Sequence, residues 1–294
     1  MKLFLIFVSK IILVFLLIAF SFDLVYTHVY ETSSPRNKFQ YFRTFKNDTI
    51  DYIFLGSSRV ENSLVVPEIE KQTGKSALNL GFQAAKMEDI YTLLQLIKAY
   101  EIHTETIFIQ VDYIFNIQEG YSNVLQYEVM PYVRDNSVTK SYLNHHFEHP
   151  SLLYYFPFYR FSDYDSKIGF RELVLNVLGK KTAIQKEKGF VGLDGQLDHC
   201  DYELPSSVNE QNVYFNQIQD FAKKNDMNII YYFSPMSLSI KNKDYVAKLQ
   251  GKIPKLHDFS SVVKEDSLFQ DCTHLNRKGA TFFTQYFIDT LLTD

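Results

Sequence analysis

Short apolar runs alternate along this chain with longer segments of helical periodicity. Strand-like runs are expected at Tyr52–Leu55, Ala77–Leu80, Ile107–Val111, Asn228–Phe233 and Leu256–Phe259. Helices are expected from Pro67, at Ala84–Tyr100, and at about Val208–Lys224, Lys243–Gln250 and Asn276–Leu292. Short and wholly apolar strands are typical of a sheet that is buried on both faces. The alternation therefore favours an α/β fold, in which a parallel sheet of about five strands is covered by helices on both faces.

The alternation stops between Asp112 and about Pro205, in a stretch rich in tyrosine and phenylalanine. A loop of this length is rarely structureless inside a compact domain. We therefore expect an aromatic-rich inserted subdomain at about 113–205. Its aromatic run, Tyr154–Phe161, could present flat rings to sugars, or could pack the core of the insertion, which is the simpler use.

The first segment of the chain, Leu3–Phe22, is apolar apart from two serines and one lysine. About 20 apolar residues are enough to span a bilayer as a helix. The segment lacks a polar face, which argues against a buried amphipathic helix. We expect a transmembrane signal-anchor at residues 1–27, a tether at 28–47 and the folded domain at 48–294.

Two lysines, Lys2 and Lys10, lie toward the N-terminal side of the apolar segment. Positive residues stay on the cytoplasmic side, so the sequence predicts a single-pass protein of the cytoplasmic membrane with an extracytoplasmic domain. A cleaved signal peptide is the alternative, because Ile11–Ala19 resembles a short hydrophobic region of such peptides. However, no convincing A-x-A cleavage site follows it.

Charge and cysteine content limit the function further. The net charge is −4, and no basic stripe with interleaved aromatics is present, which argues against a nucleic-acid-binding protein. The two cysteines, Cys200 and Cys272, could form one disulfide in an oxidising compartment or remain free thiols.

Two short segments near opposite ends of the chain contain the residue types of an activated serine. Gly56–Arg59 reads Gly-Ser-Ser-Arg after the first strand-like run, and Asp271–His274 reads Asp-Cys-Thr-His before the last helix. The carboxyl ends of the strands form the ligand crevice of an open α/β sheet. A serine there needs a base within about 3 Å, which His274 could supply while Asp271 orients it. Each residue alone also fits a turn, a loop cap or a structural histidine, so their joint placement carries the hypothesis.

These segments resemble the blocks of the SGNH (GDSL-type) hydrolases and acyltransferases. Leu55–Arg59 is similar to the first block, with Ser58 in the nucleophile position and Ser57 where many members carry Asp. Asn79–Gly81 resembles the second block, whose glycine supplies an oxyanion-hole N–H, and Asp271–Asn276 resembles the last block, D-x-x-H-L-N. The resemblance implies a three-layer, flavodoxin-like fold with strand order 2-1-3-4-5. It also implies a catalytic triad of Ser58 with the Asp and His of the last block.

One block departs from the family pattern. Members with G-x-N-D after the third strand use its Asn as an oxyanion donor, whereas Gln110–Tyr113 reads Gln-Val-Asp-Tyr. The resemblance then leaves the N–H groups of Ser58 and Gly81 as oxyanion donors, with Asn116 as a third candidate. Loss of one donor can cost about 100-fold or more in rate. The variant resembles membrane-anchored relatives that move acyl groups on envelope polymers beside a membrane-bound O-acyltransferase, which makes such a protein a candidate partner.

The sequence thus predicts a serine-dependent enzyme that transfers or removes a small acyl group on an extracytoplasmic carbohydrate or cell-envelope polymer. The reaction would pass through an acyl-Ser58 intermediate. Two alternatives stay open: an esterase or lipase-like hydrolase of small esters, and a non-catalytic scaffold subunit of a membrane O-acyltransferase complex. Arg59 is expected to pair with a nearby carboxylate or to meet an anionic substrate.

Other ligand-type residues do not form a convincing metal motif. His145, His146 and His149 include an i, i+4 pair that could bind a metal on a helix, but the H-E-x-x-H order is missing. Asp198–Cys200 also contains ligand types without a second cluster. We assign no metal, cofactor or substrate-binding residue from the sequence.

Overall fold

The computed structural model describes residues 1–293, which form two compact units. Unit 1 comprises Met1–Gln40 and Gln126–Thr182, and unit 2 comprises Tyr41–Leu125 and Ala183–Asp294. Each unit is therefore discontinuous in the sequence.

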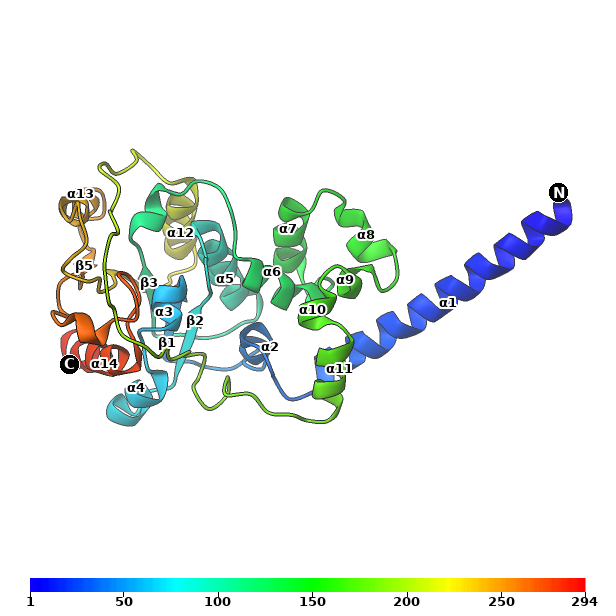
Figure 1. Ribbon diagram of the computed structural model, residues 1–294, viewed down its shortest axis with the longest axis horizontal. Helices are drawn as coiled ribbons and strands as arrows, with labels where there is room; N and C mark the ends of the chain where they lie inside the picture. The colour runs from blue at the N-terminus through cyan, green and yellow to red at the C-terminus, as the bar shows by residue number, and fades with distance from the viewer. Residues whose placement is uncertain (294) are drawn as a thin grey trace. The chain divides into compact units, whose positions relative to one another are not determined.

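Unit 2 contains the predicted parallel sheet (Figure 1). Its strands are β1 (Tyr52–Gly56), β2 (Ala77–Gly81), β3 (Thr106–Gln110), β4 (Ile229–Phe233) and β5 (His257–Asp258). The strands are all parallel and are ordered β2-β1-β3-β4-β5, so the α/β class and the expected strand order are confirmed. In this order the carboxyl ends of β1, β2 and β3 lie side by side.

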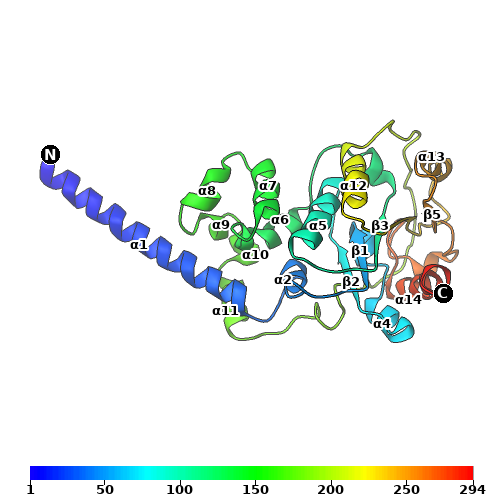
Figure 2. The ribbon, with the colours of Figure 1, turned by 180° about the vertical axis from the view of Figure 1, so that it is seen from behind.

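Helices cover both faces of this sheet. The helices of unit 2 are α3 (Ser58–Glu61), α4 (Val66–Thr73), α5 (Met87–Ala99), α12 (Val213–Lys224), α13 (Asp244–Lys252) and α14 (Arg277–Leu291), with the 3-10 helices η1 (Tyr113–Asn116) and η3 (Asp266–Leu268). Helices α5 and α12 pack against each other, as Figures 1 and 2 both show, and α4 packs against α14. Two further helices, α2 (Lys38–Arg43) and α6 (Asn123–Val129), cross the boundary between the units.

The α14 face of the sheet has an aromatic core. Phe54 and Phe108 are paired in register on β1 and β3, and their rings lie 5.2 Å apart between centroids. The ring of Phe287 in α14 lies 5.8 Å from Phe54, 5.2 Å from Phe108 and 5.3 Å from Tyr232. Because alternate strand residues point to one face, Phe54, Phe108 and Tyr232 fix the position of α14 on the sheet.

Unit 1 is helical. It contains α1 (Lys2–Thr32), η2 (Met130–Tyr132), α7 (Ser137–His146), α8 (Pro150–Tyr155), α9 (Tyr159–Ser162), α10 (Asp165–Ile168) and α11 (Phe170–Val177). Helix α1 is long and apolar enough to cross a membrane, and most of its apolar side chains are exposed. Toward its C-terminal end, Asp23, Tyr26 and Tyr30 are buried within the unit.

The structure revises the expected boundaries of the anchor, tether and insertion. Helix α1 continues to Thr32 instead of ending at residue 27, because unit 1 supplies partners for its last turns, including the Ile168 carbonyl that accepts a 2.9 Å hydrogen bond from the Tyr30 hydroxyl. The expected tether at 28–47 contains α2, whose Phe39 and Phe42 are buried. The separate subdomain is narrower than 113–205, since only residues 126–182 join the N-terminal segment in unit 1.

Candidate active site

Ser58 lies at the carboxyl edge of the sheet, as expected from the sequence. Strand β1 ends at Gly56, Ser57 is the N-cap of α3, and Ser58 is its first residue. This turn packs tightly on the neighbouring strand β2. A Cβ atom at Gly81 would lie 2.3 Å from the backbone nitrogen of Glu61 in α3, so the glycine is required for close packing.

The structure brings Ser58, His274 and Asp271 together in a hydrogen-bonded chain. Ser58 Oγ lies 2.7 Å from His274 Nε2, and His274 Nδ1 lies 2.9 Å from Asp271 Oδ2 and 3.0 Å from Oδ1. An ionised carboxylate can only accept a hydrogen bond, so Nδ1 carries the proton. The unprotonated Nε2 can then accept from the Ser58 hydroxyl, which is the arrangement that activates a serine.

Asp271 is held by the backbone of its own turn. One carboxylate oxygen, Oδ1, accepts hydrogen bonds from the backbone N–H groups of Thr273 at 2.8 Å and His274 at 2.9 Å. The Thr273 hydroxyl also donates to Oδ1, at 3.1 Å. The turn therefore fixes the carboxylate and the imidazole relative to each other before any substrate binds.

These contacts set the charge of Asp271. Burial acts to raise the pKa of this carboxyl, but the hydrogen bonds from the His274 side chain and the Thr273 N–H outweigh it and lower the pKa from 3.8 to about 2. Asp271 is therefore ionised near neutral pH and can stabilise a protonated imidazole. Its side chain is 47% exposed, so this attraction is weaker than it would be for a fully buried carboxylate.

The remaining residues of the last block hold the His274 turn in place. Leu275 is buried in the core of unit 2, and Phe269 and Leu275 form an antiparallel bridge. Asn276 is the N-cap of α14, where its side-chain oxygen accepts from the Gly279 N–H at 3.1 Å. In the D-x-x-H-L-N pattern, Asp271 and His274 thus belong to the hydrogen-bonded chain with Ser58, whereas Leu275 and Asn276 hold the turn on the rest of unit 2.

A disulfide joins the two cysteines, which the sequence left undecided. Cys200 and Cys272 are bonded across a sequence separation of 72 residues. Cys272 lies between Asp271 and His274, and its carbonyl accepts a 2.9 Å hydrogen bond from the Ser237 N–H. The bond therefore ties the turn that carries His274 to a distant loop. It also removes Cys200 from the ligand types noted at Asp198–Cys200.

A buried polar network lies behind Ser58, and sequence reasoning missed its centre, Gln110. The Gln110 side-chain oxygen accepts from both the N–H and the hydroxyl of Ser57 at 2.9 Å, and its amide nitrogen donates to Asp112. Gln110 occupies the last position of β3, next to β1. Its place at a strand end, in the segment that departs from the G-x-N-D pattern, was the signal that could have identified it. Gln110 thus holds Ser57, the residue that precedes Ser58.

Arg59 pairs with a carboxylate, as expected, and that carboxylate is Asp112. Arg59 Nη2 lies 2.7 Å from Asp112 Oδ2, and both side chains are buried. The guanidinium also covers the Tyr113 ring, 4.1 Å from its centroid. Burial raises the pKa of the Asp112 carboxyl, although Arg59, the Ile114 N–H and Gln110 act in the opposite direction. With Asp112 as its partner, Arg59 is part of the scaffold of the α3 turn.

Two of the three expected oxyanion donors make other hydrogen bonds in the structure. Among the described residues, no acceptor takes the Ser58 N–H, so that group remains a candidate donor. The Gly81 N–H instead donates to Asn79 Oδ1 at 2.9 Å, and it could serve an oxyanion only by leaving that bond. Asn116 is corrected as a third donor, because its side-chain amide donates to the Ser207 carbonyl at 2.7 Å and its oxygen accepts from the Asn209 N–H.

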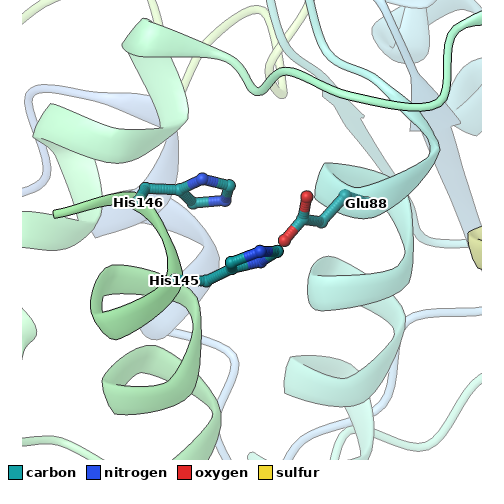
Figure 3. A group of neighbouring side chains, drawn as sticks. All are labelled: Glu88, His145 and His146. Atoms are coloured by element: carbon teal, nitrogen blue, oxygen red, sulfur yellow. The ribbon is translucent and has the colours of Figure 1, made fainter. Parts of the chain in front are cut away.

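Other candidate features lie apart from this chain of residues. A cavity of about 500 Å³ is lined by residues at the start of β4, including Asn228 and Tyr231, whereas Ser58 follows the opposite end of the parallel strands. His145 and His146 are the last residues of α7, with rings 5.0 Å apart, and His149 lies beyond the helix, so the i, i+4 pair is not helical. Figure 3 draws these two imidazoles with Glu88, a residue of α5 in unit 2, and we assign no metal site to them.

Comparisons with known proteins give no information on the function of this protein. A scan against protein-family models found no match, and a search of curated proteins found no significant relative. The fold and the contacts of Ser58, His274 and Asp271 therefore carry the functional argument.

Proposed function

We propose that this protein is a membrane-anchored, SGNH-like serine enzyme that transfers or hydrolyses an acyl ester. The observation that carries the proposal is the chain of hydrogen bonds from Ser58 Oγ to His274 Nε2, at 2.7 Å, and from His274 Nδ1 to Asp271, at 2.9 Å. The three residues come from two distant segments of the chain, with Ser58 and His274 separated by 216 positions. Purely structural roles for Ser58 in a turn, Asp271 in a loop cap and His274 in the core would not require these three side chains to form one hydrogen-bonded chain.

The reaction follows from the protonation states at the site. Ser58 Oγ attacks the acyl carbonyl carbon while its proton moves to His274 Nε2, and the carbonyl electrons move onto oxygen. The tetrahedral intermediate collapses to an acyl-Ser58 ester, and the protonated His274 gives its proton to the leaving alcohol. An acceptor hydroxyl or water then attacks the ester with the same residues acting in reverse order. Asp271 holds the imidazole in the required tautomer and stabilises its charge.

The Ser58 N–H is the leading donor to the oxyanion. It belongs to the first residue of α3, where backbone N–H groups lack intrahelical partners. The Gly81 N–H is the second donor, provided that the bound acyl group displaces Asn79 Oδ1. A hole that needs such an exchange predicts a slow enzyme for both transfer and hydrolysis.

We further propose that the site lies outside the cytoplasmic membrane. Helix α1 is long and apolar enough to serve as a single anchor, and Lys2 and Lys10 near its start favour a cytoplasmic N-terminus. The Cys200–Cys272 disulfide supports an oxidising compartment. An extracytoplasmic carbohydrate or envelope polymer is then the proposed acyl acceptor, and a membrane-bound O-acyltransferase is the proposed partner.

The first test is active-site labelling of the full-length protein in detergent micelles with a fluorophosphonate probe. Labelling is expected at Ser58, located by mass spectrometry, and is expected to vanish in Ser58→Ala and His274→Ala. Matched controls are Ser141→Ala on α7 and His257→Ala on β5, both exposed and outside the triad, which should keep full labelling. A folded protein that resists the probe would refute the enzyme proposal and favour the scaffold alternative.

Transfer and hydrolysis are separated by the fate of the acyl group. Pre-acetylated protein, prepared with p-nitrophenyl acetate, is mixed with water alone or with a soluble polysaccharide acceptor. Faster loss of acetyl-Ser58 with acceptor, together with acetylated sugar, would support a transferase. An equal rate in both mixtures, with acetate as the only product, would support the small-ester hydrolase.

A further inference from the structure

Asp23 marks the point where one face of α1 becomes buried in unit 1, while Leu24 and Val25 on another face stay about half exposed. Residues before it, including Phe20 and Phe22, are about half exposed, whereas Tyr26 and Tyr30 after it are buried. Asp23 itself is buried and paired, with Arg160 Nη2 at 2.9 Å and Arg134 Nη1 at 3.3 Å from its Oδ1. A buried carboxylate held by two arginines belongs to the folded unit, so any bilayer around α1 ends close to this residue.

Aromatic residues of the α8–α9 turn lie at the level of Asp23. The backbone N–H of Phe158 donates to Asp23 Oδ2 at 2.9 Å, and the Phe158 ring lies 5.7 Å from Phe22 and 4.9 Å from Tyr26. Phe158 has a left-handed backbone with φ of 68°, at the turn between α8 and α9. Tyr155 is 83% exposed, which the expected use of this run in core packing does not explain.

Helix α11 adds an exposed apolar face beside α1. Phe170, Val174, Val177 and Leu178 follow the i, i+4, i+7, i+8 spacing of one helix face, and Phe170 and Leu178 are 66% and 70% exposed. The opposite face is fastened to α1, since Asn176 Oδ1 accepts from the Ser33 hydroxyl at 2.8 Å and Leu173 is buried. We call Tyr155, Phe156, Phe170, Val174, Val177 and Leu178 the apolar rim.

A groove lies between α1 and the α1-facing side of α11. The groove has a volume of about 420 Å³ and is lined by Leu173 of α11 and by apolar residues of α1 from Val14 to Val25. The exposed apolar side chains of α1 therefore extend up to the point where Leu173 of α11 packs beside them. Arg171 in α11 and Lys180 and Lys181 just after it are exposed, as suits a helix that meets anionic headgroups.

We propose that unit 1 is an interfacial domain whose apolar rim inserts into the outer boundary of the lipid bilayer around the exit point of α1. This inference rests on the proposed membrane span of α1. Water-soluble proteins rarely leave large apolar patches exposed, and tyrosine and phenylalanine are suited to the headgroup level. The bilayer is the occupant because the rim begins where the lipid-facing part of α1 ends. The rim thus holds the helical unit against the membrane surface.

The test uses the lack of tryptophan in this chain, which makes any introduced tryptophan a unique reporter. Four full-length variants are reconstituted in phosphatidylglycerol-containing vesicles: Phe15→Trp in α1, Tyr155→Trp and Phe170→Trp in the rim, and Phe282→Trp on α14. Phe282 is 48% exposed and lies outside the rim, so it is the matched control. Quenching is measured with iodide in the water and with lipids brominated near the headgroup or deep in the acyl chain.

We expect Tyr155→Trp and Phe170→Trp to lose most of their emission with shallow brominated lipid and little with iodide, while Phe282→Trp shows the reverse. Phe15→Trp should respond to deep bromine. If only Phe15→Trp responds to brominated lipid and the rim variants respond to iodide, docking is refuted while the membrane span stands. If Phe15→Trp does not respond to brominated lipid, the proposed membrane span of α1 is refuted, and the docking of the rim is refuted with it. Equal lipid quenching at Phe282 would also overturn the assignment to the rim.

Discussion

The disulfide offers the most quantitative test of how unit 2 is held together. The perturbation is the double variant Cys200→Ser/Cys272→Ser, which removes the cross-link without leaving a free thiol. The link closes a loop of 72 residues, so it restricts the unfolded chain strongly. The same change frees the turn that carries His274, because Cys272 lies between His274 and Asp271. Stability and labelling should therefore both respond.

The magnitude follows from the loop length. For a closed loop of 72 residues, the chain-entropy relation gives a loss of about 15 cal/mol/K in the unfolded chain, or about 4.4 kcal/mol at 25 °C. Measured losses are typically about 2–4 kcal/mol, so about 4.4 kcal/mol is the upper value. With a urea slope of about 2 kcal/mol/M, the unfolding midpoint should fall by about 1–2 M.

The assay must report on unit 2 alone. Hydrogen exchange of the full-length protein in micelles is followed at increasing urea and read on peptides from β1 and α14, which both belong to unit 2. The parent protein reduced with dithiothreitol should match the double variant. A midpoint shift below about 0.5 M, which corresponds to about 1 kcal/mol, would refute the loop-closure argument.

Labelling of Ser58 provides the second readout of the same variant. Misplacement of a catalytic group by about 1 Å can cost about 100-fold in rate. The hydrogen bond from the Ser237 N–H to the Cys272 carbonyl remains in the variant, so the turn should be loosened and not lost. We expect slower fluorophosphonate labelling without urea. An unchanged labelling rate would mean that the backbone contacts alone position His274.

Three further changes test the contacts around the site. Asp271→Asn should slow labelling of Ser58, by less than the roughly 10⁴-fold that the same change costs in a buried triad, because the Asp271 side chain is half exposed. A labelling rate equal to the parent's would show that Asp271 does not help to activate Ser58. Since its folded pKa of about 2 lies below 3.8, the stability that Asp271 contributes should be fully present above pH about 4 and be lost as the pH falls toward 2, as acid titration of the parent and of Asp271→Asn would show. Gly81→Ala should lower the free energy of unfolding by about 1–3 kcal/mol, because the added Cβ would meet the α3 backbone. Gly251→Ala, which has open space around it in α13, should raise the free energy of unfolding by up to about 1 kcal/mol. Equal changes in the two variants would contradict the packing argument. Arg59→Gln should lower the free energy of unfolding in urea by about 3–5 kcal/mol, because it leaves the Asp112 carboxylate buried without its arginine partner. The double variant Arg59→Met/Asp112→Leu should recover much of this loss. A loss well below about 3 kcal/mol in Arg59→Gln would contradict a stabilising role of the buried pair.

The sheet could be predicted because its signal is local. The strands β1 to β4 of unit 2 are short, mostly apolar runs, and the longer helices between them follow a 3.6-residue period. The predicted strand ends differ from the observed ones by at most one residue, as at Ile107–Val111 against Thr106–Gln110. Strands β1, β2 and β3 are buried at every position, which explains why most of their residues are apolar and why the sequence reveals them.

The helical unit could not be predicted because its partners are distant in sequence. Arg160 and Phe161 pack on Asp23 and Tyr30, residues that lie in the expected anchor and tether. Asp23 and Arg160 are 137 positions apart, and a pattern within one segment does not reveal a contact across such a distance. Composition alone predicts divisions at residues 27 and 47, whereas in the structure the N-terminal part of unit 1 ends at Gln40.

The sequence by itself determined the α/β class, the long apolar N-terminal helix and the two segments that contain Ser58, Asp271 and His274. These depend on local period, local composition and short motifs. Only the tertiary structure decided that the Ser58 hydroxyl faces His274 Nε2, that Cys200 meets Cys272, and that Gln110 and Asp112 support the turn from behind. Tertiary structure also gave the side chain of Asn116 and the N–H of Gly81 other partners. Hydrogen bonds of this kind depend on the distance and angle between atoms of separate elements, which are fixed when the sheet and its helices pack and not by the residues along any one of them.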